Sequence, residues 1–313
     1  MSTQTLAPKA TPVTTRDQPR GTRKEAGPGW LFIAPFAVFF VLFLIWPVIY
    51  MLIASMFDTT LVTPGFGNFV GFANYAEMLG RDDFWEALWH TIQFTIYTVP
   101  PLVILSFVFA VLANRVGRGQ WFFRLAFFVP FILPSAAIAL IWNLIYTPAT
   151  GLWNSFQTLL GADDPNPVLG TPDLAMIGIA ITTIWWTIGF NFVLYLAGLQ
   201  DIPRELYEAA SVDGSTPWQQ IRFITIPMLS RTTTLVILLQ IIASLKIFDQ
   251  VYLMTAGGPG TSTQVLLTLV ANTAFTDYRV GAASAASVLL FIVILLVTVI
   301  RQFVQRAQER RAA

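Results

Sequence analysis

Long apolar runs alternate with shorter polar segments along this chain. A helix needs about 20 mainly apolar residues to cross the hydrocarbon core of a bilayer, and six stretches qualify. They are Trp30–Met56, Ala87–Ala113, Phe122–Tyr146, Leu174–Leu199, Thr233–Thr255 and Ala282–Val304. The pattern therefore predicts an all-α, polytopic membrane protein with six transmembrane helices inside one domain, residues 29–304.

The segments at both ends are polar. Residues 1–28 are rich in Thr, Pro, Ala and charged side chains without an apolar period, which is typical of a disordered tail. Residues 305–313 form a short basic tail. We therefore expect the N-terminal tail, residues 1–28, to have no fold of its own.

Prolines recur within the predicted spans. Each removes a backbone donor and is expected to bend or break its helix, which membranes tolerate where neighbours or a water-lined cavity satisfy the freed carbonyls. They are Pro47, Pro100, Pro101, Pro130 and Pro134. They indicate either packing kinks or helices shaped around a pathway.

The composition supports this class. Hydrophobic residues make up 55% of the chain and charged residues 11%, against roughly 25% charged in typical soluble domains. The mean hydropathy is +0.65. There is no cysteine, which excludes a disulfide framework, a thiolate metal site and a cysteine nucleophile.

The basic residues predict the orientation. Most of the 18 Lys and Arg residues lie in the two tails and in the second–third and fourth–fifth connections, whereas acids collect in the other connections. Basic residues near span ends accumulate on the cytoplasmic side. Both termini are therefore predicted to be cytoplasmic.

The connection at residues 200–230 is the longest on the predicted cytoplasmic side. Arg204 to Asp213 forms an amphipathic pattern, Gly214 suits a helix stop, and Thr216 to Gln219 has the form of a capping box. A second helix follows, up to Pro227. Because a carboxylate is disfavoured at a helix C-terminus, Asp213 is expected to turn toward the next helix and hold the corner. The element is either a docking knob or an ordered loop packed under its own bundle.

At these residues the chain resembles a known family. Glu208-Ala209-Ala210, Asp213-Gly214, Ile224 and Pro227 resemble the EAA loop of permease subunits of binding-protein-dependent ABC importers. We call residues 200–230 the EAA loop.

Further stretches resemble the carbohydrate branch, the maltose and glycerol-3-phosphate type. They are Val70 to Tyr75, Phe84-Trp85, Gly151 to Asn154, Ala197 to Gln200, Ile202-Pro203, Phe248 to Gln250 and Thr255 to Gly260. The similarity runs roughly from Trp30 to Arg301. It departs at Ile221, where an aromatic residue is frequent, at Ser230, where proline is common, and at Trp153, where a second leucine is usual.

The resemblance implies a type I ABC importer permease of the MetI-like fold in the inner membrane. Its partners would be a second homologous permease subunit, two ATP-binding subunits and an extracytoplasmic solute-binding protein. The transported solute would be sugar-like. ATP and Mg would bind only to the ATPase partners, so this chain would need no cofactor. Glu208, Ala209, Ala210, Asp213, Gly214, Ile224 and Pro227 would couple to the ATPase. Gly257, Gly258 and Pro259 would lie beneath the binding protein.

Polar residues inside the spans are candidates for the solute pathway, because burying them in hydrocarbon is costly. Lys246 and Asp249 are three apart in the fifth predicted span, on one helical face and able to pair. They form either an ion pair that locks the helix or a contact with substrate. Gln240 lies more centrally and could point into a pathway.

Two tryptophans lie near mid-depth in the fourth predicted span, away from the interfacial belts. Trp185 and Trp186, with Asn191 and Tyr195 further in, could form an aromatic platform beside an amide, which suits a sugar ring. Packing alone also explains large residues there.

Other functions have less support. The single histidine, His90, lies near a span end and is expected to be structural; no HExxH motif or pair of intramembrane acids is present. The glycine-rich turn after the fifth span has no following lysine, so it is no phosphate loop. The sequence thus predicts a transport subunit rather than an enzyme, with a self-contained secondary transporter or channel as the alternative.

Overall fold

The computed structural model describes residues 26–63, 65–116, 119–162 and 166–312. It divides into two compact units, residues 1–50 and 51–313. The first contains α1 (Ala26–Phe40), the π-helix η1 (Val41–Ile45) and the start of α2 (Trp46–Ala54). Most of the predicted N-terminal tail lies outside the described residues, and α1 takes in its last three positions.

The second unit is helical throughout its described part, apart from turns and one isolated bridge between Phe57 and Phe69. Its elements are α3 (Ala73–Gly80), α4 (Asp82–Arg115), α5 (Gln120–Ile132), α6 (Ser135–Tyr146), α7 (Leu152–Leu159), α8 (Pro172–Gln200), α9 (Arg204–Val212), α10 (Pro217–Gln220), η3 (Ile221–Thr225), α11 (Ile226–Met228), α12 (Ser230–Leu245), α13 (Asp249–Met254), α14 (Leu266–Ala271), η4 (Asn272–Thr276) and α15 (Val280–Ala312). Helix α15 continues beyond the predicted span into the predicted basic tail.

Span counting agrees with the prediction. Among the described residues four helices are long and apolar enough to cross a membrane, and the number rises to six if each of two bent pairs counts as one span. The all-α, multi-pass fold is therefore confirmed.

Prolines break some helices and not others. Between α5 and α6 the axis turns by 98° at Leu133 and Pro134, where the missing donor ends the helix. By contrast, α4 runs through Pro100 and Pro101 without a break, contrary to the expectation that each proline would bend or break its helix. Near Pro47 the helix is irregular but continuous. The π-helix η1, in which the helix is locally wider, ends two residues before this proline, and α2 follows directly.

The fifth span is not one helix. The prediction ran from Thr233 to Thr255, whereas α12 ends at Leu245 and α13 begins at Asp249. At its other end, α12 meets the preceding helical segment at 64°. The apolar pattern continues through both irregularities, so composition alone could not locate them.

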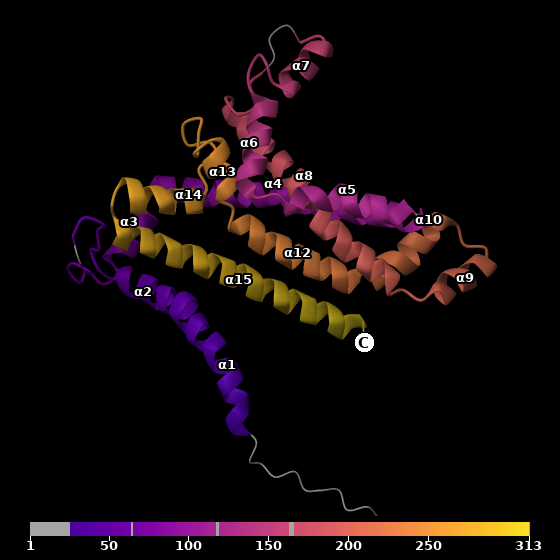
Figure 1. Ribbon diagram of the computed structural model, residues 1–313, viewed down its shortest axis with the longest axis horizontal. Coiled ribbons are helices and arrows are strands. Elements are labelled where there is room, and N and C mark those ends of the chain that lie inside the picture. Colours follow the sequence, from indigo (N-terminus) through magenta and orange to yellow (C-terminus); the bar gives the residue numbers. More distant parts are fainter. Residues whose placement is uncertain (1–25, 64, 117–118, 163–165, 313) are drawn as a thin grey trace, which may run out of the picture. The chain divides into compact units, whose positions relative to one another are not determined.

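The core is built around α8, which packs against α4 and α5, while α12 packs against α4 (Figure 1). Helices α5 and α8 approach closely at Gly189, where an added Cβ would lie 1.9 Å from the Phe127 carbonyl oxygen. Only glycine allows that approach. The ring of Phe127 then packs 5.1 Å from that of the buried Phe192.

Within this unit, α9 and α10 lie at one end of the bundle and α3 and α14 at the other (Figure 1). A candidate solute cavity and these two ends are the parts that bear on function.

Candidate functional site

The EAA loop folds as a helix, a corner and a second helix, as predicted. Helix α9 ends at Val212, and Gly214 takes the left-handed conformation with φ of +79°. The Thr216 side chain accepts a bond from the Gln219 amide at 3.3 Å, and the Gln219 side chain accepts one from the Thr216 amide at 2.7 Å. The glycine stop and the capping box are both confirmed.

The corner is held by a residue that sequence analysis missed. Gln220 Nε2 donates to Ser211 Oγ at 2.9 Å and to Ser215 Oγ at 3.2 Å. Asp213 is exposed, and its carboxylate accepts no hydrogen bond from the described residues. The expectation that Asp213 holds the corner is wrong, because the Thr216 hydroxyl already caps the next helix. Gln220 follows both serines in the chain, and a glutamine near two serines gives only a weak signal in the sequence.

The outer surface of the loop is exposed and partly apolar. Glu208, Ala209 and Pro227 are exposed. Large apolar side chains accompany them: Val212 at 89%, Trp218 at 66% and Phe223 at 68% exposure. Large apolar side chains left exposed on one short loop are candidates for an interaction surface.

The other side of the loop joins the bundle. Ala210 and Ile224 are half-buried, and Ile224 packs against the core cluster that contains Phe192 and Tyr195. The Tyr207 and Thr225 hydroxyls lie 2.9 Å apart. The loop thus has one face anchored on its own helices and one face open.

A cavity of about 190 Å³ lies among α4, α8, α12 and α13. It brings together four predicted pathway residues. Its lining comprises Phe94, Thr98, Leu102, Thr183, Trp186, Thr187, Gln240, Ala243, Ser244, Lys246, Ile247, Phe248, Asp249 and Gln250. Aromatic, hydroxyl, amide and charged groups therefore face one space.

Hydrogen bonds order the polar lining. Gln240 Nε2 donates to Oδ1 of the fully buried Asn191 at 2.9 Å. Asp249 Oδ2 accepts from Ser135 Oγ at 2.8 Å.

Lys246 and Asp249 do not form the ion pair that was one of the two alternatives for them. Both side chains are exposed and line the cavity, but no ion pair joins them among the described residues. Three residues apart on a continuous helix they would share a face. Because the helix is interrupted between Leu245 and Asp249, the two side chains no longer lie on one helical face.

The two tryptophans do not form one platform. Trp186 lines the cavity and its Nε1 donates to the Leu133 carbonyl at 3.2 Å. Trp185 instead packs edge-on against Trp142 at 5.7 Å, outside the lining. Neighbouring residues on a helix point about 100° apart, since a turn takes 3.6 residues. Tyr195 is fully buried, 5.8 Å from Phe107, and also lies outside the lining.

At the end opposite the EAA loop, side chains of α4 anchor the segment that follows Gly257, Gly258 and Pro259. His90 Nδ1 lies 3.1 Å from the Gln264 carbonyl oxygen and must donate, because a carbonyl oxygen only accepts. Thr91 Oγ1 accepts from the Leu266 amide at 3.0 Å. His90 is therefore a satisfied structural residue, as predicted.

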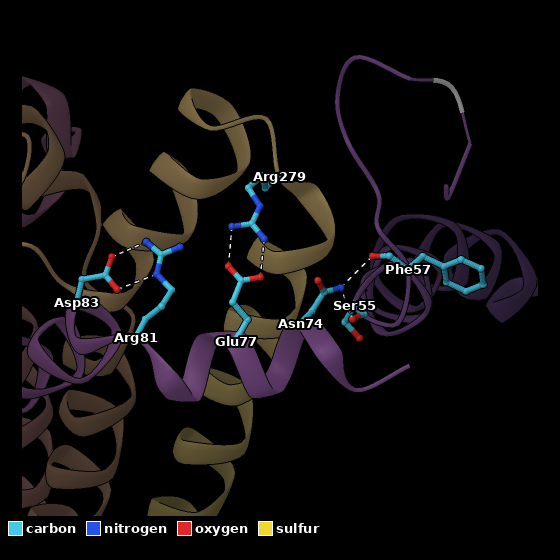
Figure 2. Close-up of polar contacts among 7 residues, drawn as sticks. All are labelled: Ser55, Phe57, Asn74, Glu77, Arg81, Asp83 and Arg279. Atoms are coloured by element: carbon cyan, nitrogen blue, oxygen red, sulfur yellow. Dashed lines mark hydrogen bonds and ion pairs between the residues drawn. The ribbon is translucent and has the colours of Figure 1, made fainter. Parts of the chain in front are cut away.

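A second anchor at this end joins α3 to the start of α15, and we call Asn74, Glu77 and Arg279 the α3 clasp (Figure 2). Arg279 donates two bonds of 2.6 Å to the Glu77 carboxylate. Asn74 Nδ2 donates to the Ser55 and Phe57 carbonyls, both at 2.9 Å. The hydrogen bond from Arg279 holds the pKa of Glu77 below its ordinary value.

The comparison with protein families decides the class. Residues 66–313 match the model of the binding-protein-dependent transport system inner membrane component. The chain belongs to this family. It is a membrane component of a transport system, as the EAA loop indicated.

Two curated relatives agree. The chain is 33% identical to the sulfoquinovosyl glycerol transport system permease protein SmoG of Agrobacterium fabrum, over 89% of this chain and 90% of the relative. It is 34% identical to the trehalose/maltose transport system permease protein MalF of Thermococcus litoralis, over 88% and 93%. The predicted resemblance to sugar permeases is confirmed.

A solved structure shows the same fold. A chain of a bacterial ABC transporter that imports the acidic polysaccharide alginate superposes with a TM-score of 0.77 at 23% identity, covering 90% of this chain and 96% of that one.

Proposed function

We propose that this chain moves a sugar or sugar-like solute across the inner membrane through the cavity near Trp186 and Gln240, driven by ATPase partners at the EAA loop. One observation carries the proposal. Helix α8 runs from Trp186 to the start of the loop, and α12 returns from the loop to Gln240. A displacement of the loop therefore acts on both walls of the cavity.

The cavity lining favours a sugar. An indole offers a flat apolar face, and the hydroxyls and amides around it can bind a rim of hydroxyl groups. Trp186 lies beside Thr183, Thr187 and Gln240 in this lining. The names of the relatives, sulfoquinovosyl glycerol and trehalose/maltose permeases, support the same substrate class.

The partners we propose are a second homologous permease subunit, two ATP-binding subunits that hold ATP and Mg, and an extracytoplasmic binding protein. A bacterial alginate ABC transporter with a similar chain has been solved with its pentasaccharide-bound periplasmic protein, which supports the last of these. The distribution of basic residues supports a cytoplasmic EAA loop and cytoplasmic termini.

The mechanism follows from these positions. The loaded binding protein docks near Gly257, Gly258 and Pro259, and ATP-driven closure of the partners displaces the open face of the EAA loop. Helices α8 and α12 transmit that displacement to the cavity. Coupling resides in Glu208, Ala209, Ala210, Asp213, Gly214, Ile224 and Pro227. This chain itself breaks no covalent bond.

Charge reversal at Glu208 tests the coupling. We propose that Glu208 faces a basic group of the ATPase partner. In vesicles holding the whole importer, we expect Glu208→Lys to reduce ATPase stimulation by loaded binding protein at least tenfold, because the new lysine would then meet a like charge, which costs several kcal/mol across an interface. Glu205→Lys, the same change on the same helix, is the control and should retain stimulation. Solute uptake by this chain alone, without ATP, would instead establish a secondary transporter or channel.

The neighbouring tryptophans test the pathway. Trp186→Ala should lower solute uptake about tenfold, whereas Trp185→Ala should leave it near the native rate, because only Trp186 lines the cavity. Equal losses in both variants, measured as initial uptake rates at matched protein levels, would contradict the assigned pathway.

A further inference from the structure

A second pocket, of about 210 Å³, lies where the end of α4 meets the EAA loop. It is separate from the solute cavity, since the two share no residue. Its lining comprises Val111, Asn114, Arg115, Leu199, Tyr207, Gln220, Ile221 and Thr225. These residues come from α4, α8, α9, α10 and η3, so the pocket joins two long helices to the loop.

The pocket is lined by one charged side chain, that of Arg115. Arg115 is the last residue of α4, is exposed, and forms no ion pair with the described residues. No lining residue is acidic. A guanidinium without a carboxylate partner is a ready site for an anion, because it presents several N–H donors in a fixed plane.

The neighbouring amide adds a donor. Gln120 Nε2 donates to Asn114 Oδ1 at 3.1 Å, which occupies the acceptor of that side chain and identifies its other atom as the NH₂ group. No described residue accepts from Asn114 Nδ2. The pocket therefore offers Arg115 and Asn114 as unused donors from adjacent positions on one helix end.

Size and position indicate the kind of anion. A volume of about 210 Å³ is large enough for a phosphate group with a few attached carbons. Val111, Leu199 and Ile221 supply an apolar wall for those carbons. Arginine binds phosphate oxygens in a bidentate manner, and anionic lipids are abundant at the cytoplasmic face where this pocket would lie.

We infer that this pocket binds a phosphate anion, either the phosphodiester of an anionic lipid headgroup or a free phosphate, between Arg115, Asn114 and the EAA loop. Its occupant lies between the end of α4 and the EAA loop, bound by the donors of Arg115 and Asn114 and packed against the loop side of the pocket, and so holds the loop against the bundle. The effect on coupling rests on the proposed function, whereas binding of the anion does not.

Binding is measured on the full chain in a neutral detergent by thermal unfolding, since a ligand that binds the folded state raises its stability. Phosphatidylglycerol, phosphatidylcholine and inorganic phosphate are titrated separately. We expect stabilisation by phosphatidylglycerol, phosphate or both, but not by phosphatidylcholine. Arg115→Gln should weaken the apparent affinity about tenfold, the loss of roughly one charge-assisted contact.

Two variants control this measurement. Arg231→Gln removes an exposed basic residue outside the pocket and should bind like the native chain. Arg115→Lys keeps the charge and should recover part of the affinity, which separates anion binding from a folding defect. Stabilisation that is equal in native protein and Arg115→Gln would overturn the site. A response to phosphatidylglycerol alone identifies lipid as the source, and one to phosphate identifies a free anion.

The consequence for coupling is measured separately, in vesicles of phosphatidylcholine with or without phosphatidylglycerol or phosphate. The ligand that binds should change stimulated ATPase activity several-fold in the native importer and little in Arg115→Gln. Binding without any change in activity would overturn the bridging role while leaving the site and the permease assignment intact. If Arg115→Gln instead prevents assembly with the ATPase subunits and no anion binds, the pocket holds a partner's side chain and the inference is wrong.

Discussion

The two ends of the bundle are held by different kinds of contact. In the EAA loop, the side-chain bonds at the corner join residues close in sequence: Thr216 to Gln219, three apart, and Gln220 to Ser211, nine apart. At the opposite end, Glu77 and Arg279 are 202 residues apart. The loop is thus a locally built body that can move without losing its own bonds, whereas the opposite end is tied between distant segments.

The chemistry of the two ends also differs. The corner of the EAA loop uses neutral hydroxyls and amides, and its outward face bears large apolar side chains such as Trp218. The opposite end uses the α3 clasp, in which Arg279 pairs with Glu77 and Asn74 donates to backbone carbonyls of the segment after α2 (Figure 2). We therefore expect salt and acid to weaken the α3 clasp. Single substitutions in the EAA loop should instead loosen the loop alone.

The largest effect is expected from Gly281→Ala at the start of α15. The added Cβ would lie 2.1 Å from the Phe57 carbonyl oxygen, so the backbone beside the clasp must shift. Overpacking of this kind costs about 1–3 kcal/mol. Thermal unfolding of the purified chain measures the loss. Gly80→Ala, where nothing lies within 4 Å of the new Cβ, is the control, and an equal loss there would show that the close approach has no role.

A smaller effect is expected in the EAA loop from Thr216→Ala, which removes the cap of α10. Loss of a capping side chain costs about 1 kcal/mol. Because the loop is built from local bonds, faster amide hydrogen exchange should be confined to residues 211–225. Thr216→Ser keeps a hydroxyl and should exchange like the native loop. Faster exchange spreading to α3 and α15 would break the distinction between the two ends.

A still smaller effect is expected from the ion pair of the clasp. The Glu77 and Arg279 side chains are 40% and 42% exposed, so solvent screens their attraction and the coupling free energy should stay below about 1 kcal/mol. A double-mutant cycle with Glu77→Gln and Arg279→Gln, read by thermal unfolding, measures it. A coupling of several kcal/mol, or one unaffected by salt, would show that the pair acts as a buried one.

The smallest effect is expected from pH. Because Arg279 lowers the pKa of Glu77 from its ordinary 4.5, the stabilisation is present above that value. It is lost as pH falls through the lower pKa of the folded state. Native protein and Glu77→Gln should therefore differ in melting temperature at pH 6 and converge once the pH has fallen below the lowered pKa of Glu77 in the folded state. A difference that persists at low pH would assign the stabilisation to another group.

Much of this architecture could be predicted from sequence because its signals are local. Apolar length predicted the spans, and Thr216 with Gln219 predicted a capping box that the structure contains. Gly214 predicted the stop of α9. Each of these depends on side-chain periodicity or on the conformational preference of one or two residues.

The errors share a cause. Lys246 and Asp249 were placed on one helix that the fold interrupts. A shared platform of Trp185 and Trp186 was one of two interpretations, although only Trp186 of the two lines the cavity. Asp213 was given a role that Thr216 and Gln220 perform. In each case the direction of the side chain depends on the exact helix geometry and on the bonds formed around it, which the spacing of residues alone does not give.

The sequence by itself determined the membrane-spanning helical class, the EAA loop and its corner, because apolar length, caps and left-handed glycines act within a few residues. Only the tertiary structure decided which polar groups share the cavity, that Arg115 faces a pocket beneath the loop, and that Glu77 meets Arg279. These contacts join segments far apart in the chain, and their formation depends on how the helices pack rather than on the spacing of residues.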